Sequence, residues 1–247
     1  MSKARNAGTS VGRAGARKRT RRRTTHFGAP RYSARATRAT GRSMRSHLLD
    51  AASALFKARG LNGASMTAIA DAADAFPSQV TYYFRSKEAL FVEAACRDVL
   101  YVAERAEKAA ARARTPRAYL TALTDGVAGA DGLVLFVEAL ILARQRPDLV
   151  PAIARTIERL HVEGARAYGG KVARHGWRTY HAPDVSARKF WTVALGAALR
   201  GHAVSQSAAA MSVSMREVMG ELAEAGSAAI PKLRVVTGAG RSPARST

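Results

Sequence analysis

The sequence predicts an all-α protein, and three observations lead to this prediction. From Ser43 onward, apolar residues recur at the three- and four-residue spacing of helices. No segment alternates polar and apolar residues as a half-buried strand does, and prolines fall at the edges of the apolar segments. With 247 residues and 47% hydrophobic content, the chain is long enough for a packed core in one large domain or two smaller ones.

Residues 1–42 differ from the rest of the chain. They carry 13 Lys or Arg and no acid, within a formal net charge of +22 for the whole sequence, and they include the run "RKRTRRRTT" at 17–25. Because the segment has almost no apolar residues, we expect a disordered basic arm. Three interpretations stay open: a solvated tail, sequence ahead of a start at Met44, or an arm that follows DNA phosphates.

Two helices are expected after the arm. The first begins at Ser43 and ends at Gly60, and its apolar face comprises Leu48, Leu49, Ala52, Leu55 and Phe56. Ser65 can cap the second helix, whose apolar residues are Ile69, Ala70 and Ala73. These two helices and the third form a compact N-terminal unit in this prediction.

The third helix begins near Pro77, because proline suits the first helical turn, and "FRS" at 84–86 ends it. Ser86 then caps a fourth helix that runs to about Arg112. Further helices are expected over about 117–128, 132–145, 149–174, 184–206 and 212–229, followed by a flexible tail at 231–247. The segment "GLVLFVEALILA", 132–143, is apolar on all sides and is expected to be buried all round.

The second and third helices fit a helix-turn-helix. A three-residue turn, 74–76, joins them, and the third helix begins with polar residues. In such a motif the second helix presents its N-terminal side chains to base edges in the major groove. Ser78, Gln79 and Thr81 are residue types that reach bases there, and the hydroxyls of Tyr82 and Tyr83 can contact phosphate or sugar.

Three segments, "LLDAASALFKARG", "SMTAIADAA" and "YYFRSKEALF", stand in a characteristic order. Over about 43–95 the sequence resembles the DNA-binding domain of TetR (TetR/AcrR) family transcriptional repressors. The resemblance implies a C-terminal half, 96–230, that binds a small molecule and forms a homodimer. Together with the residue types above, it places the DNA contacts at Arg45, Ser65, Thr67, Ser78, Gln79, Thr81, Tyr82, Tyr83 and Lys87.

Two departures from the family pattern affect this surface. The turn has Asp74, Ala75 and Phe76 where the family usually has Gly, Val and a small hydroxyl residue. Asp tolerates a left-handed backbone, so the turn can form, but Phe76 has no side-chain oxygen with which to cap the next helix. Thr81 stands where the family often has Tyr, so that phosphate contact is expected to shift to Tyr82.

For the C-terminal half, the sequence gives candidate residues for two roles. The proposed ligand-lining residues are Phe136, Leu140, Tyr168, Trp177 and Trp191, although such side chains also serve as plain core. Two apolar stripes in the last two helices predict a two-fold four-helix dimer interface, with one stripe over the protein's own core as the alternative. The interface candidates are Leu195, Leu199, Met215, Met219 and Leu222.

Several function classes find no support. The single cysteine, Cys96, excludes an internal disulfide, and the six histidines lack metal-ligand spacing. No Gly-rich phosphate loop or nucleophile motif occurs, so we expect no enzyme, cofactor or metal. The longest apolar run is about half the length of a membrane span, and we expect a cytoplasmic protein without a membrane partner.

The sequence therefore predicts a sequence-specific DNA-binding transcriptional regulator. The expected partners are double-stranded DNA, a second copy of the chain and a small, mostly apolar effector that releases a repressor from its operator. The alternative is a basic protein that coats nucleic acid without specificity, and a basic membrane-surface protein is a third reading. The polar face with Gln79 and Thr81 favours the first, because a coating protein does not need it.

Overall fold

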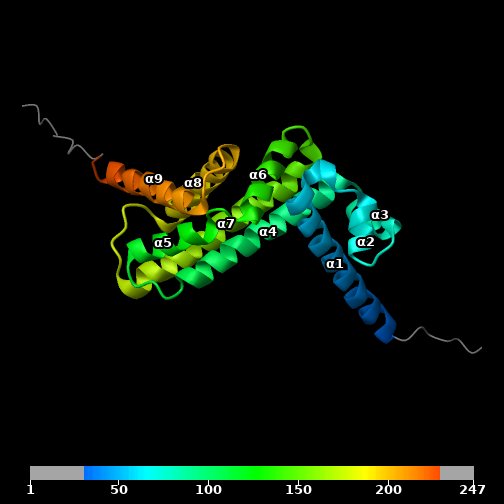
Figure 1. Cartoon of the computed structure of the whole chain (residues 1–247). Coiled ribbons are helices and arrows are strands. Elements are labelled where there is room, and N and C mark those ends of the chain that lie inside the picture. Colours follow the sequence, from blue (N-terminus) through cyan, green and yellow to red (C-terminus); the bar gives the residue numbers. More distant parts are fainter. Residues whose placement is uncertain (1–30, 229–247) are drawn as a thin grey trace, which may run out of the picture. The chain divides into compact units, whose positions relative to one another are not determined.

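A computed structural model describes the backbone of residues 31–228 and the side chains of Gly41 and residues 43–220. Regular secondary structure in these residues is helical, as predicted. The elements are α1 Arg31–Gly63, α2 Met66–Ala72, α3 Pro77–Phe84, α4 Lys87–Ala110, α5 Pro116–Val127, α6 Asp131–Ala143, the short 3-10 helix η1 Pro147–Leu149, α7 Val150–His175, α8 Pro183–Ala203 and α9 Ala208–Ala228 (Figure 1).

Helix α1 begins earlier than the sequence predicted. Its first residue is Arg31, so residues 31–42 of the expected arm are helical, while residues 1–30 lie outside the described part of the chain. Residues 31–42 are rich in Ala and Arg, which are among the strongest helix formers, and this composition lets the helix extend backwards from Ser43. The predicted break at Gly60 is confirmed, since its φ of 66° and ψ of 176° are not helical.

The turn between α2 and α3 forms as expected. Ser65 caps α2, because its Oγ accepts a hydrogen bond from the Ala68 N–H at 3.0 Å. Asp74 has a φ of 50°, which confirms the left-handed conformation predicted for the turn. Helix α3 follows, with Phe76 in an extended conformation at its N-cap.

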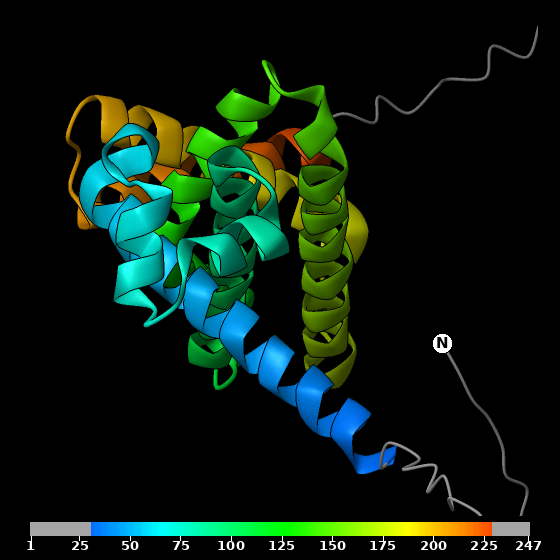
Figure 2. The ribbon, with the colours of Figure 1, turned by 90° about the vertical axis from the view of Figure 1, so that its right-hand side faces the viewer.

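One face of α3 packs into the core and thereby orients the other. Val80 and Phe84 are buried, and they join a cluster that includes Phe56 of α1 and Phe91 of α4. The rings of Phe56 and Phe91 meet edge to face at 5.1 Å. Figure 2 shows α2 and α3, in cyan, beside the start of α4. The polar residues of α3 are therefore turned towards solvent.

Helix α4 runs without a break across the predicted domain boundary at residue 95. It packs against α5, α6 and α7, α7 packs against α8, and α9 packs against α5 and α8. The expected boundaries of α5 to α9 agree with the structure to within a few residues.

The segment 132–143 is not buried all round, because one face of α6 carries Asp131 and Glu138, and Ile141 on that face is 50% exposed.

Among the described residues, no single helix is long and apolar enough to cross a membrane, whereas the pair α5 and α6, bent by 71°, passes that test together by length and composition.

Candidate functional site

The exposed face of α3 carries most of the predicted base-contacting residues. Ser78, Thr81 and Tyr82 are exposed, and Tyr82 is 80% accessible. Tyr83 is half-buried, and its ring meets that of Tyr82 edge to face at 5.2 Å. The structure therefore brings these side chains to one surface beside the N-terminus of α4.

Gln79 has a second role that sequence reasoning missed. Its Oε1 accepts a hydrogen bond from the Phe76 N–H at 2.9 Å, which is the half of a capping box that the N3 residue supplies. The other half, in which an N-cap side chain accepts from a helix N–H, is missing because Phe has no side-chain acceptor. That oxygen keeps a second lone pair, and the amide nitrogen still carries two N–H donors. Thr81 also bonds locally, since its hydroxyl donates to the Pro77 carbonyl oxygen at 3.3 Å.

Of the other predicted DNA contacts, Ser65, Thr67 and Lys87 lie at helix beginnings, whereas Arg45 lies within α1. Thr67 is exposed in the first turn of α2, and Lys87 is the first residue of α4, where Ser86 caps the helix. Positive charge and free backbone N–H groups at such a position favour an anion. Arg45 instead pairs with Glu93, and its guanidinium lies 5.1 Å from the centre of the Phe84 ring. This pairing ties Arg45 to the fold and competes with a DNA contact.

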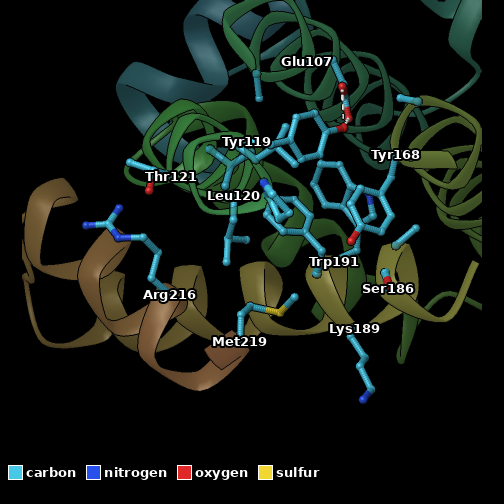
Figure 3. Close-up of a pocket in the computed structure, with 18 of the residues that line it drawn as sticks. Glu107, Tyr119, Leu120, Thr121, Tyr168, Ser186, Lys189, Trp191, Arg216 and Met219 are labelled. Carbon is cyan, nitrogen blue, oxygen red and sulfur yellow. Dashed lines mark hydrogen bonds between the residues drawn. The ribbon is translucent and has the colours of Figure 1, made fainter. Parts of the chain in front are cut away.

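A cavity of about 1130 Å³ lies among α4, α5, α7, α8 and α9 (Figure 3). Of the predicted ligand residues, Tyr168 and Trp191 line it. Phe136, Leu140 and Trp177 are not among the residues that line it. Phe136 and Leu140 belong to α6, which contributes nothing to the cavity wall. The ring of Trp177 lies beside that of Tyr168, with the ring centres 6.4 Å apart, and the Trp177 Nε1–H donates to the Arg114 carbonyl oxygen at 3.0 Å.

Sequence reasoning missed Glu107 and Tyr119, a hydrogen-bonded pair in the wall of this cavity. The Tyr119 hydroxyl lies 2.7 Å from Glu107 Oε1 and 2.9 Å from Oε2 and donates to this carboxylate (Figure 3). Burial raises the pKa of Glu107, an effect that the hydrogen bond from Tyr119 and the charge of Lys171 partly offset. The Tyr119 ring stacks on Tyr168 at 5.8 Å. A signal was present, because Glu107 interrupts the apolar face of α4 next to buried Ala106 and Ala110.

The fold agrees with comparisons to known proteins. Residues 48–94 match the family model for bacterial regulatory proteins of the tetR family, and residues 116–220 match the model for a bacterial transcriptional repressor C-terminal domain. A proposed transcriptional regulator from Rhodococcus sp. RHA1 is 34% identical, with a TM-score of 0.65 over 73% of this chain and 95% of that chain. The chain belongs to the TetR family of transcriptional regulators.

More distant TetR-type structures share the fold. A proposed TetR-family transcriptional regulator from Mesorhizobium loti MAFF303099 is 21% identical, with a TM-score of 0.59 over 75% of this chain and 96% of that chain. The multidrug binding protein EbrR, in a complex with imidazole, is 23% identical, with a TM-score of 0.53 over 72% of this chain and 94% of that chain. A search of curated proteins gives no match.

In this TetR-family chain, α8 and α9 present exposed apolar residues next to buried ones. Leu199 is 52% exposed and Leu195 is partly buried, so both reach the surface of α8. Of the other predicted interface residues, Met215 is buried in the protein's own core and Met219 is partly buried and lines the cavity. Leu222 lies outside the described side chains. Among the described side chains of α9, the exposed large apolar residues are Val213 and Val218.

A buried carboxylate ties α1 to α4 at the base of the DNA-binding domain. Asp98 of α4 accepts hydrogen bonds from Ser53 Oγ at 2.5 Å and Arg97 Nη2 at 3.1 Å, and it pairs with Lys57 Nζ at 2.5 Å. Burial alone raises the pKa of Asp98, but the hydrogen bonds from Lys57 and Ser53 outweigh it, and the pKa is lowered overall. Sequence reasoning missed this cluster, because its members come from two helices that only the fold brings together.

Proposed function

We propose that the protein is a repressor that binds a palindromic operator as a homodimer and leaves it when a small effector enters the cavity. The observation that carries this proposal is the course of α4. Its first residue, Lys87, lies beside the α3 surface, and Glu107, near its other end, lies in the cavity wall. An effector that moves α4 therefore also acts on the DNA-binding surface, provided that it binds the two conformations with different affinities.

The cavity lining supports a mostly apolar effector with a few polar groups. Aromatic and aliphatic side chains such as Phe190, Trp191 and Leu160 form much of the wall. Glu107 provides an acceptor in this wall, where Tyr119 holds it in place. The alternative function, non-specific coating of nucleic acid, has less support, because α3 exposes a face of Ser, Thr and Tyr rather than a row of Lys and Arg.

The DNA-binding half of the proposal is tested by two substitutions with different expected signatures. Gln79→Ala removes a base-reading amide and should cost about 1–3 kcal/mol on the preferred operator, with relaxed specificity. Lys87→Ala should weaken binding to all sequences alike and flatten the dependence of affinity on salt concentration. Both are measured by fluorescence anisotropy with a selected operator and a scrambled duplex. Parent-like behaviour of both variants would mean that the recognition surface lies elsewhere.

The effector half is tested with a screen of apolar metabolites that reads melting temperature and operator release together. We expect at least one compound to raise the melting temperature and to release DNA. Tyr168→Ala should abolish this response, because Tyr168 lines the cavity and stacks on Tyr119. Tyr101→Ala is the control, since Tyr101 is an exposed tyrosine of α4 outside the cavity lining. A compound that acts equally on parent and Tyr168→Ala would place the effector site elsewhere.

A further inference from the structure

The two most exposed large hydrophobic residues in the described part of the chain both belong to the α3 region. Tyr82 is 80% exposed, and Phe76, at the N-cap of α3, is 75% exposed. A lone exposed apolar residue is ordinary on a protein surface. Phe76 differs because it stands at the helix N-terminus that a helix-turn-helix protein directs into the major groove.

Neither local structure nor packing accounts for a phenylalanine at this position. An N-cap favours Ser, Thr, Asp or Asn, whose oxygen satisfies a free N–H, and an apolar residue there weakens the helix start. The ring is also not part of the core, whose nearest members on α3 are Val80 and Phe84. The residue therefore lowers helix stability and leaves an apolar ring in water, unless a partner covers it.

The structure also holds Phe76 in a defined position. Pro77 follows it, and the residue before a proline is restricted to extended conformations. Phe76 has a φ of −82° and a ψ of 143°, in agreement with this restriction. Its N–H donates to Gln79 Oε1 at 2.9 Å, a bond within the same helix start. Because the backbone is already fixed at two points, only the side-chain torsions of Phe76 are left to be ordered when the ring binds.

Resting on the proposed function, we propose that Phe76 is a specificity-determining residue that reads the 5-methyl group of a thymine in each operator half-site. In the major groove the thymine methyl is the apolar mark of an A·T pair, and a phenyl ring is a suitable contact for it. Two residues at the start of α3 then have different roles. Gln79 holds the Phe76 backbone and keeps its amide N–H donors for a base, while Phe76 supplies apolar readout.

The test removes the methyl group and nothing else. The full-length protein first selects its preferred operator from random duplexes, and each thymine is then replaced singly by deoxyuridine. We expect one position per half-site where the parent loses about 4-fold in affinity, which is the value of one buried methyl group. Phe76→Ser should bind the thymine and uracil operators equally. Because serine is a favoured N-cap, the melting temperature of this variant should equal or exceed that of the parent.

A second variant separates Phe76 from the other methyl-contacting candidate on α3. Thr81→Ser removes the Thr81 methyl group and keeps the hydroxyl that donates to Pro77. It should retain the parent's ratio of thymine to uracil affinity. If the ratio is lost in Thr81→Ser and kept in Phe76→Ser, Thr81 reads the methyl and the proposal for Phe76 is wrong.

Three further outcomes would also overturn the proposal. If no deoxyuridine substitution weakens the parent while Gln79→Ala still relaxes specificity, α3 reads DNA without Phe76, and the proposed function survives. If Phe76→Ser lowers the affinity for the thymine and uracil operators by the same factor, it keeps the parent's ratio of the two affinities. Phe76 then packs on sugar or phosphate and carries no sequence information. If the parent selects no sequence at all, the proposed function fails, and the role of Phe76 fails with it.

Discussion

Leu199→Arg should convert the protein from a dimer to a monomer and lower operator affinity by about 100-fold or more, because a two-site complex then becomes a single-site one. Leu199 is 52% exposed on α8, and α9, which packs on α8, exposes Val213 and Val218. An unpaired guanidinium buried in a two-fold interface formed by these residues would be strongly unfavourable. Sedimentation should show the parent near twice the chain mass of 26.3 kDa and the variant near that mass itself.

Val162→Arg is the matched control for this substitution. Val162 is 55% exposed on α7, on a face that it shares with the exposed Glu158, Arg159 and Arg166. An additional arginine there meets solvent, so this variant should stay dimeric and bind the operator like the parent. A parent that sediments as a monomer at micromolar concentration, yet protects a palindrome from nuclease, would contradict the dimer.

Asp98→Asn should lower the free energy of unfolding by about 1.5–3 kcal/mol, the range for hydrogen bonds that involve a charged group. Asp98 is 5% exposed, accepts a hydrogen bond from Ser53 and forms ion pairs with Lys57 and Arg97. An uncharged amide at this position would leave Lys57 and Arg97 without their buried anionic partner. Asp50→Asn is the control. Asp50 pairs with Arg97 at 2.7 Å, but its side chain is 63% exposed, and such surface pairs are worth about 0–1 kcal/mol.

The effect of Asp98→Asn should also depend on pH. The folded protein lowers the pKa of Asp98, so this carboxylate stabilises the fold at pH values above its unfolded pKa of about 3.9. Its contribution declines as the pH falls from that value through the lower folded pKa. The free energies of unfolding of parent and variant, measured with urea at a series of pH values, should therefore converge below about pH 4. A difference in stability that stays constant from pH 7 to pH 3 would show that Asp98 acts through packing instead.

The sequence predicted those features that depend on neighbouring residues. Ser65 and Ser86 cap the helices predicted for them, Asp74 takes the left-handed turn conformation, and Phe84 is core. Each follows from the preference of a residue type for a local backbone or for burial. The predicted start of helix α1, Ser43, is later than its start in the structure, Arg31. The low apolar content of residues 31–42 indicated disorder, but their Ala and Arg residues also favour a helix.

The lining of the cavity, in contrast, could not be predicted from local sequence patterns. Its wall comes from five helices and the segment 178–181, and whether an aromatic residue faces a void or the core depends on how those helices pack. Phe136 and Trp191 are both buried apolar residues in helices, yet only Trp191 borders the cavity. Met215 and Val218 differ in the same way, since both belong to the apolar stripe of α9, yet Met215 is buried in the protein's own core and Val218 is exposed. The capping role of Gln79 was hidden because it depends on a turn whose geometry only the structure gives.

The central claim is that α3 reads a specific sequence, and competition between DNA duplexes tests it most directly. The protein is bound to the labelled duplex that it enriches most from a random pool, and unlabelled random DNA is added in excess at physiological salt concentration. We predict an enriched palindrome that random DNA displaces only at about 1000-fold or greater excess. Enrichment of no common sequence, with displacement by random DNA at equal concentration, would contradict the account and favour a protein that coats nucleic acid without specificity.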